Sequence, residues 1–90
     1  MIFEAVWYNG WDEPPGYFLL DEAEGDTAEE ALVQNVGRLT QQVREMFSLD
    51  DWSDSKIQET LYVFPSDALI SLRSIQRARE LRELDQRREN

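Results

Sequence analysis

The chain contains no cysteine and no histidine among its 90 residues. The absence of cysteine excludes disulfides, thiolate metal sites and thiol nucleophiles. The absence of histidine removes the commonest general base and the commonest metal ligand in proteins. Serine and threonine are present, but no histidine or suitably placed lysine is there to activate one of them as a nucleophile. We therefore expect a protein that is not an enzyme and needs no cofactor.

The sequence also lacks a long apolar run. No stretch approaches the ~18 consecutive apolar residues that a membrane-spanning helix requires. The first residues, Met-Ile-Phe-Glu, show neither the basic region nor the apolar segment of a secretory signal. We expect a cytoplasmic protein, of bacterial or phage origin, that makes no membrane contact.

Basic side chains are scarce in the first two thirds of the chain. The formal net charge is −10, and residues 1–60 carry 14 acidic and 3 basic side chains, whereas residues 61–90 carry 5 acidic and 6 basic ones. This imbalance disfavours direct binding to nucleic acid or to an anionic membrane, and it favours cationic partners such as a basic protein. It also motivates one functional alternative, an acidic inhibitor that imitates the phosphates of a nucleic acid.

The strongest pattern in the sequence is a helical one over residues 26–47. Its apolar side chains recur at steps of three and four and therefore fall on one stripe of an α-helix: Leu32, Val36, Leu39, Val43, Met46 and Phe47. Thr27 with Glu30 has the spacing of a capping box, and Asp26 with Glu29 offers the same arrangement one residue earlier. We predict that this helix covers the core of the domain.

The flanking patterns predict three strands and a second helix. Residues 2–8, 17–23 and 57–64 are rich in β-branched and aromatic side chains. Pro65 ends the third strand, and Ser66 or Asp67 is then expected to cap a helix over about residues 66–87, with a frayed tail at 88–90. Residues 1–90 are expected to form a single domain.

The order strand, strand, helix, strand, helix predicts a two-layer α+β domain. A hairpin followed by a right-handed helical crossover places the third strand beside the first, so the sheet order is 2-1-3. We expect both helices to cover one face of this three-stranded sheet. The other face would stay open and apolar, which is typical of an interface, and we therefore expect a homodimer.

The same topology brings the loop at residues 9–16 and the loop at residues 48–56 to one end of the domain. Two tryptophans and several carboxylates would meet there, namely Trp11, Asp12, Glu13, Asp50, Asp51, Trp52 and Asp54. Because aromatic faces and carboxylates attract cations, this tryptophan–carboxylate rim is a candidate site for a cationic small ligand or peptide. The alternative is structural, with the tryptophans covering the ends of the core and the acids capping turns. The spacing does not support a calcium loop, because Trp52 and Ser55 stand where such a loop needs an oxygen ligand and a glycine.

The run Gly25-Asp26-Thr27-Ala28-Glu29-Glu30-Ala31-Leu32, which follows a pair of predicted strands, resembles the helix entry of HicB-like antitoxins. Members of that family have a small β-sheet with a helix entered through a similar stretch, and they neutralise a small RNA-cleaving toxin. The resemblance is confined to this run. The family's extra short strand before the helix and a C-terminal DNA-binding region are not recognisable in this chain. An antitoxin role is the alternative function that the resemblance implies.

The last helix offers a second candidate contact surface. Its apolar side chains recur mostly in steps of three, so the stripe wraps around the helix and only part of it can pack on the domain. We predict an interface that involves four of these side chains, namely Leu72, Ile75, Leu81 and Leu84. Alternating arginines and acids favour the structural alternative, a solvated helix face with ion pairs between successive turns. The preferred function is a small acidic protein-interaction module that forms a homodimer.

Overall fold

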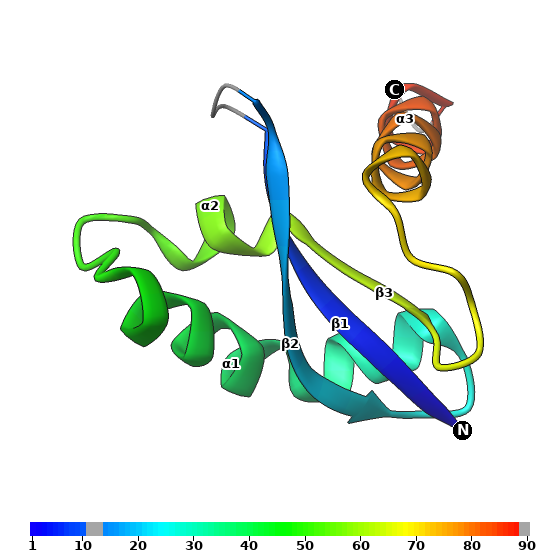
Figure 1. Cartoon of the computed structure of the whole chain (residues 1–90), viewed down its shortest axis with the longest axis horizontal. Helices are drawn as coiled ribbons and strands as arrows, with labels where there is room; N and C mark the ends of the chain where they lie inside the picture. Colours follow the sequence, from blue (N-terminus) through cyan, green and yellow to red (C-terminus); the bar gives the residue numbers. More distant parts are fainter. Residues whose placement is uncertain (11–13, 89–90) are drawn as a thin grey trace.

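The computed structural model describes residues 1–10 and 14–88. Six elements follow one another along these residues: β1 (Ile2–Asn9), β2 (Gly16–Glu24), α1 (Ala28–Phe47), α2 (Asp54–Gln58), β3 (Leu61–Pro65) and α3 (Leu72–Arg88). The three strands form one antiparallel sheet in the order β2-β1-β3, which confirms the predicted order (Figure 1). β1 is central because the chain crosses over along α1 before it returns as β3.

α1 begins where the capping pattern predicts. The Thr27 hydroxyl accepts a hydrogen bond from the Glu30 backbone N–H at 3.1 Å, and this bond satisfies one of the donors that a helix start leaves unpaired. The helix ends at Phe47 and is capped by Ser48, whose backbone is left-handed with φ 53° and whose N–H donates to the Arg44 carbonyl. A left-handed residue in this position is a common helix terminator.

α1 covers one face of the sheet. Alternate side chains of β1 point to that face, and the buried cluster there consists of Ala5, Trp7, Leu39, Val43, Ile57 and Leu61. A smaller cluster of Phe3, Ala23 and Ala31 continues the same layer toward the start of α1. Full burial of each large apolar side chain stabilises the fold by about 1.5–3 kcal/mol, so this layer is the main core.

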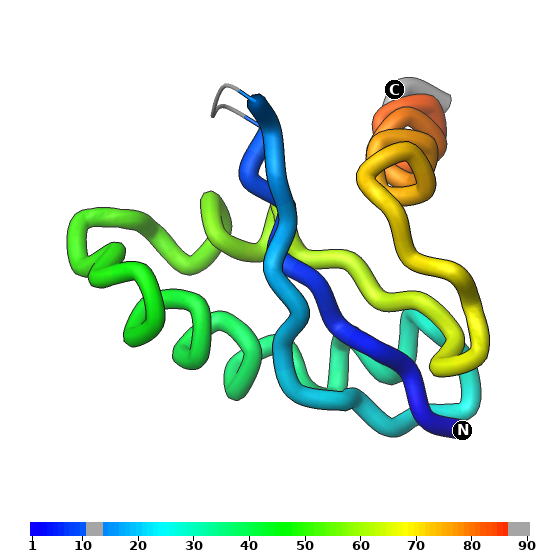
Figure 2. Tube along the Cα trace, viewed as in Figure 1, coloured from blue at the N-terminus to red at the C-terminus, as the bar shows by residue number. Residues whose placement is uncertain are grey.

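α3 packs on the opposite face of the sheet, so the expectation that both helices share one face is wrong. In Figure 2 the orange helix and the green helix lie on opposite sides of the blue strands. Val6 and Tyr8 of β1 are buried on the α3 side against Tyr62 and Ile75. Because both sets of β1 side chains are apolar, leaving either set in water would forfeit about 25 cal/mol per Å² of apolar surface. The described residues therefore form three layers, and α3 covers the face that was expected to stay open for a partner.

The segment before β3 differs from the sequence prediction. Ile57, expected at the start of the third strand, lies in α2, and its side chain is buried beneath that short helix. The Ser53 hydroxyl caps α2 by accepting a hydrogen bond from the Lys56 N–H at 3.2 Å. The strand begins only at Leu61 and ends at Pro65.

α3 also begins later than predicted, at Leu72 rather than at Ser66 or Asp67. Ser71 and Ser74 form a reciprocal cap, in which each hydroxyl accepts a hydrogen bond from the other residue's backbone N–H, at 3.2 and 2.9 Å. The helix then runs to the last described residue. None of the helices within residues 1–10 and 14–88 is long and apolar enough to cross a bilayer.

Candidate functional site

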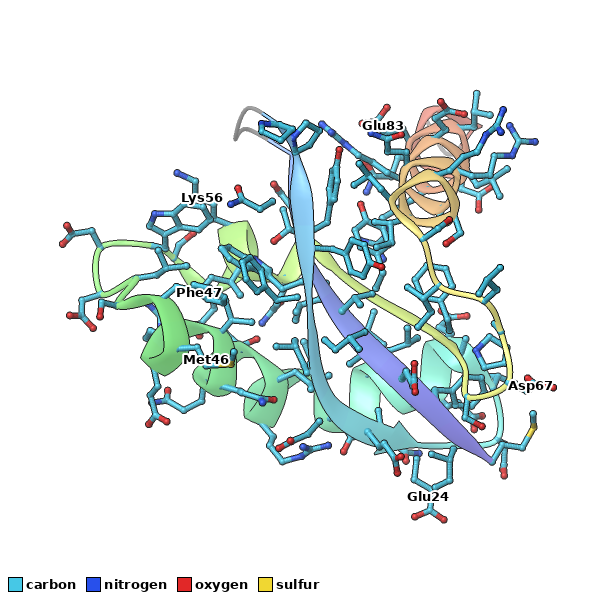
Figure 3. The ribbon with its side chains drawn as sticks, in the orientation of Figure 1. Glu24, Met46, Phe47, Lys56, Asp67 and Glu83 are labelled. Carbon is cyan, nitrogen blue, oxygen red and sulfur yellow. The ribbon has the colours of Figure 1, made fainter. Side chains whose placement is uncertain are left out.

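The tryptophan–carboxylate rim lies only partly within the described residues. Three of its members fall outside them, namely Trp11, Asp12 and Glu13. Their closeness to the loop at residues 48–56 therefore stays a prediction. Trp52 packs edge-on against Trp7 of β1, with the ring centroids 6.2 Å apart. The amine of Lys56, labelled in Figure 3, lies 4.2 Å from the centroid of the Trp52 ring, so a cation of the chain itself contacts that ring.

Of the described carboxylates of the rim, one forms an ion pair and two are exposed. Asp54 forms an ion pair with Arg44 of α1, and the same guanidinium donates to the carbonyls of Leu49 and Trp52 at 3.0 and 2.6 Å. This arginine ties the loop to the end of α1, which favours the structural alternative for Asp54 and Trp52. The two other described acids are exposed, namely Asp50 and Asp51. Across the described ranges no group of three or more acidic side chains is placed to hold a metal ion.

The four predicted interface residues of α3 separate into two pairs. Ile75 is fully buried and Leu72 is partly buried in the cluster on the sheet, so these two side chains hold α3 within the chain. Leu81 and Leu84 are about half exposed, because side chains six and nine positions after Ile75 point away from the sheet on a helix of 3.6 residues per turn. An interface through this second pair stays a prediction.

A cavity of about 610 Å³ lies between α3, α2 and the neighbouring ends of β1 and β3. Its principal side chains are two tyrosines, two arginines and two glutamates, namely Tyr8, Tyr62, Arg79, Arg82, Glu59 and Glu83. The sequence analysis missed this cavity because its walls come from four separate segments. The only indication of this cavity in the sequence was the cluster of arginines in the last helix. The sequence alone does not show that these arginines face the sheet.

Arg82 is held firmly in one wall of the cavity. Its guanidinium carbon lies 4.1 Å from the centroid of the Tyr62 ring, and its terminal nitrogens donate to the carbonyls of Glu59 and Leu61 at 3.1 and 2.9 Å. Among the ion pairs of the described residues, none involves Arg82. Within the described part of the chain its charge is therefore balanced by carbonyl dipoles and an aromatic face and not by an ion pair with a carboxylate.

The second arginine of the cavity is more exposed. The Arg79 guanidinium lies 5.9 Å from the centroid of the Tyr8 ring, and its Nε is 3.4 Å from a Glu83 carboxylate oxygen. The Tyr8 hydroxyl accepts a hydrogen bond of 3.4 Å from the Gln76 amide. Burial raises the pKa of the Tyr62 hydroxyl, and the charges of Arg82 and Arg79 oppose this rise. At neutral pH the Tyr62 ring is thus a neutral wall beside two positive charges.

The outer edge of β2 is shielded along only half of its length. Gln42, Arg38 and Asn35 of α1 bond to backbone groups of residues 21–24, at 3.2, 2.8 and 3.3 Å. Over residues 16–20 no side chain of the described chain forms such a bond with the backbone. The charges follow the same division, because residues 21–24 contain three acids and residues 16–20 contain none.

Residues 16–20 instead expose apolar side chains. Phe18 is 42% exposed and Leu19 is 58% exposed, and as neighbours on a strand they point to opposite faces of the sheet. Met46 of α1, labelled in Figure 3, is 50% exposed and stands one helical turn beyond Gln42, on the stripe of α1 that meets β2. We refer to Phe18, Leu19 and Met46 as the edge patch. The predicted sheet order 2-1-3 makes this strand an edge, and its acidic end (Asp21, Glu22 and Glu24) was expected to be the exposed part, whereas the exposed apolar side chains lie in its other half.

Comparison of the chain with protein-family models, with curated proteins and with solved structures found no match. The resemblance of residues 25–32 to the helix entry of HicB-like antitoxins therefore stays a prediction.

Proposed function

We propose that this chain is a non-enzymatic protein-interaction module that works as a homodimer, with the edge patch at the contact. The uneven shielding of β2 carries the proposal. α1 side chains and carboxylates shield residues 21–24, whereas over residues 16–20 no described side chain bonds to the backbone edge, and exposed apolar side chains flank it. An unshielded edge of this kind is a template for the addition of another strand.

A second copy of the same strand fits this edge in an antiparallel arrangement. Pairing centred on Phe18 places Phe18 opposite its own copy and Tyr17 opposite Leu19 of the second chain, so apolar side chains meet on both faces. It also places Asp21 opposite Pro15 of the second chain, so like charges do not face one another within residues 15–21. The two sheets would join into one sheet of six strands related by a two-fold axis, which is the commonest symmetry of homo-oligomers.

Charge and size set the expected strength of this dimer. A pairing of about five residues is small, and interfaces below about 1,200 Å² are typical of weak or transient complexes. Each chain carries a net charge of −10, so two copies repel one another at low ionic strength. Added salt screens this repulsion. The dimer is therefore expected to be weak and to become tighter as the salt concentration rises.

Sedimentation equilibrium over a range of protein concentrations tests the proposal. We expect a monomer–dimer equilibrium, and Leu19→Lys should weaken it by at least about tenfold, because the substitution buries a charge at the contact. Val33→Lys is the matched control, since Val33 is a comparably exposed apolar side chain, 65% exposed, on α1. Circular dichroism of both variants checks that each keeps its fold.

Three results would contradict the proposal. The wild-type chain could stay monomeric at every concentration, the Val33 variant could weaken the dimer as much as the Leu19 variant, or added salt could dissociate the dimer. A monomer that binds a basic protein, with an affinity that falls steeply with salt, would support the acidic inhibitor instead.

A further inference from the structure

The cavity between α2 and α3 lies apart from the edge patch, on the face of the sheet that α3 covers. We infer that it binds a small organic anion, whose carboxylate or phosphate group is held by Arg79 and Arg82. This inference does not rest on the proposed function, because neither arginine belongs to the edge patch.

The first support is the fixed position of Arg82. Stacking on Tyr62 and two hydrogen bonds to backbone carbonyls hold the guanidinium in one place. These two bonds use one donor on each terminal nitrogen, so the other N–H donors of the group stay available. A guanidinium that is already oriented loses less freedom when it binds an oxyanion than a free surface arginine does.

The second support is the distribution of charge around the cavity. Arg82 has no carboxylate partner within the described residues, and Arg79 contacts Glu83 through Nε at 3.4 Å, a contact that leaves its two terminal nitrogens free of that pair. The remaining acid of the wall, Glu59, is exposed. In a chain of net charge −10, a wall whose arginines balance its glutamates repels an anion less than the acidic surface of the rest of the chain does on average.

The third support is the size and composition of the space. At about 610 Å³ the cavity has the volume of a typical small-molecule site and is far larger than an inorganic ion needs. Gly10 contributes to this shape, because a Cβ atom built there would lie 2.5 Å from the Tyr8 ring, so a side chain at this position would displace the ring. The ligand class is therefore an anionic head group on an organic body, and not a bare ion.

The experiment is an NMR titration of the intact chain at constant ionic strength. Benzoate and phenyl phosphate supply the two head groups on the same aromatic body, and benzyl alcohol supplies the body without a charge. Amide signals of Thr60 and Gln58 in the cavity wall report binding. We expect saturable shifts with one or both anions and an affinity for benzyl alcohol about tenfold weaker, because charge-assisted hydrogen bonds supply the difference. Whichever of benzoate and phenyl phosphate binds more tightly identifies the head group as a carboxylate or a phosphate.

Two variants and a control make the test specific. Arg79→Gln should weaken anion binding about fourfold, whereas Glu83→Gln should tighten it by a similar factor, because it removes the carboxylate that competes for Arg79. Arg73→Gln is the control, since Arg73 is an exposed arginine of the same helix outside the cavity. Both test residues are exposed, so neither substitution is expected to unfold the domain. The fold of each variant is verified if its signals from outside the cavity match those of the wild type.

Opposite effects of the two cavity variants, with no effect of Arg73→Gln, support the inference. It is overturned if neither anion shifts the cavity signals, if benzyl alcohol binds as tightly as benzoate, or if Arg73→Gln weakens anion binding as much as Arg79→Gln does. The last result would mean that the anion responds only to the net charge of the chain. A negative result in this titration would not contradict the proposed dimer, because dimerisation is tested in a separate experiment with variants of the edge patch.

Discussion

One glycine precedes α1 and another lies within it. Replacing each of them by alanine is expected to change the stability of the fold in opposite directions. Gly25 precedes the helix, and a Cβ atom added there would lie 2.5 Å from the backbone nitrogen of Ala31 and 2.8 Å from its Cα. Ala31 is fully buried against Phe3 and Ala23, so its backbone has little room to move. Gly37 lies in the middle of α1, and the same Cβ atom would meet nothing within 4 Å.

The magnitudes follow from these two environments. Gly25→Ala forces a backbone shift in a packed region, and overpacking of this kind destabilises by about 1–3 kcal/mol. Gly37→Ala removes the entropic cost of a glycine in a helix interior and should stabilise the fold by about 0.5–1 kcal/mol. For a domain of this size, about 1 kcal/mol corresponds to a change in melting temperature of about 4–8 °C. The two variants should therefore melt on opposite sides of the wild type.

Thermal and urea unfolding followed by circular dichroism measures both variants. The urea midpoints give the change in free energy of unfolding, provided that the slope of each transition matches that of the wild type. If both substitutions shift stability in the same direction, or if Gly25→Ala is neutral, the close approach of Gly25 to Ala31 does not describe the folded protein.

Three further substitutions test other parts of the fold. Ser48→Gly should stabilise the domain by about 1 kcal/mol in urea unfolding, because φ 53° is strained for serine and free for glycine; destabilisation would contradict the left-handed end of α1. Ile75→Ala should destabilise the domain by about 2–5 kcal/mol, whereas Leu84→Ala should change stability by less than about 0.5 kcal/mol, and equal effects would refute the packing of α3. Tyr62 keeps its proton to a higher pH when folded than when unfolded, so stability should fall as pH rises above 10.0. Tyr62→Phe should reduce that fall, and an unchanged pH profile would refute the burial of the hydroxyl.

The sequence was sufficient to predict the parts of the fold that local patterns determine. The stripe from Leu32 to Phe47 has the period of a helix, and Thr27 with Glu30 marks its start, so α1 and its cap were predicted correctly. The order of the strands followed from the handedness of the crossover. These features depend on residues close together in the chain or on a general rule of topology.

The starts of α2, β3 and α3 were harder to predict because several residues compete for the same role. Ser66, Asp67 and Ser71 are all good N-cap residues, and the partner at Ser74 decides between them. Ile57 is β-branched and adjoins a strand-like run, yet the cap at Ser53 places it in a helix. Local propensity does not separate such alternatives, since tertiary contacts select one of them.

The position of α3 depends on contacts between distant segments. No rule of handedness decides on which face a helix packs after an edge strand, and the choice here follows from the second apolar set of β1. Val6 and Tyr8 pack against Ile75 of α3, and this contact removes their apolar surfaces from water. The stacking of Arg82 on Tyr62 is a consequence of that choice, so the cavity could not have been predicted from the cluster of arginines alone.

β1 precedes in the chain every element that covers it, and this order has a consequence for synthesis. When the hairpin of β1 and β2 leaves the ribosome, neither of its apolar surfaces has a cover, because α1 follows it and β3 and α3 come later still. The nascent chain must therefore carry Val6 and Tyr8 unprotected until α3 emerges, at a rate of about 5–20 residues per second. Chains of this protein that end before α3 should accordingly bind chaperones or aggregate, whereas chains released with α3 complete should not.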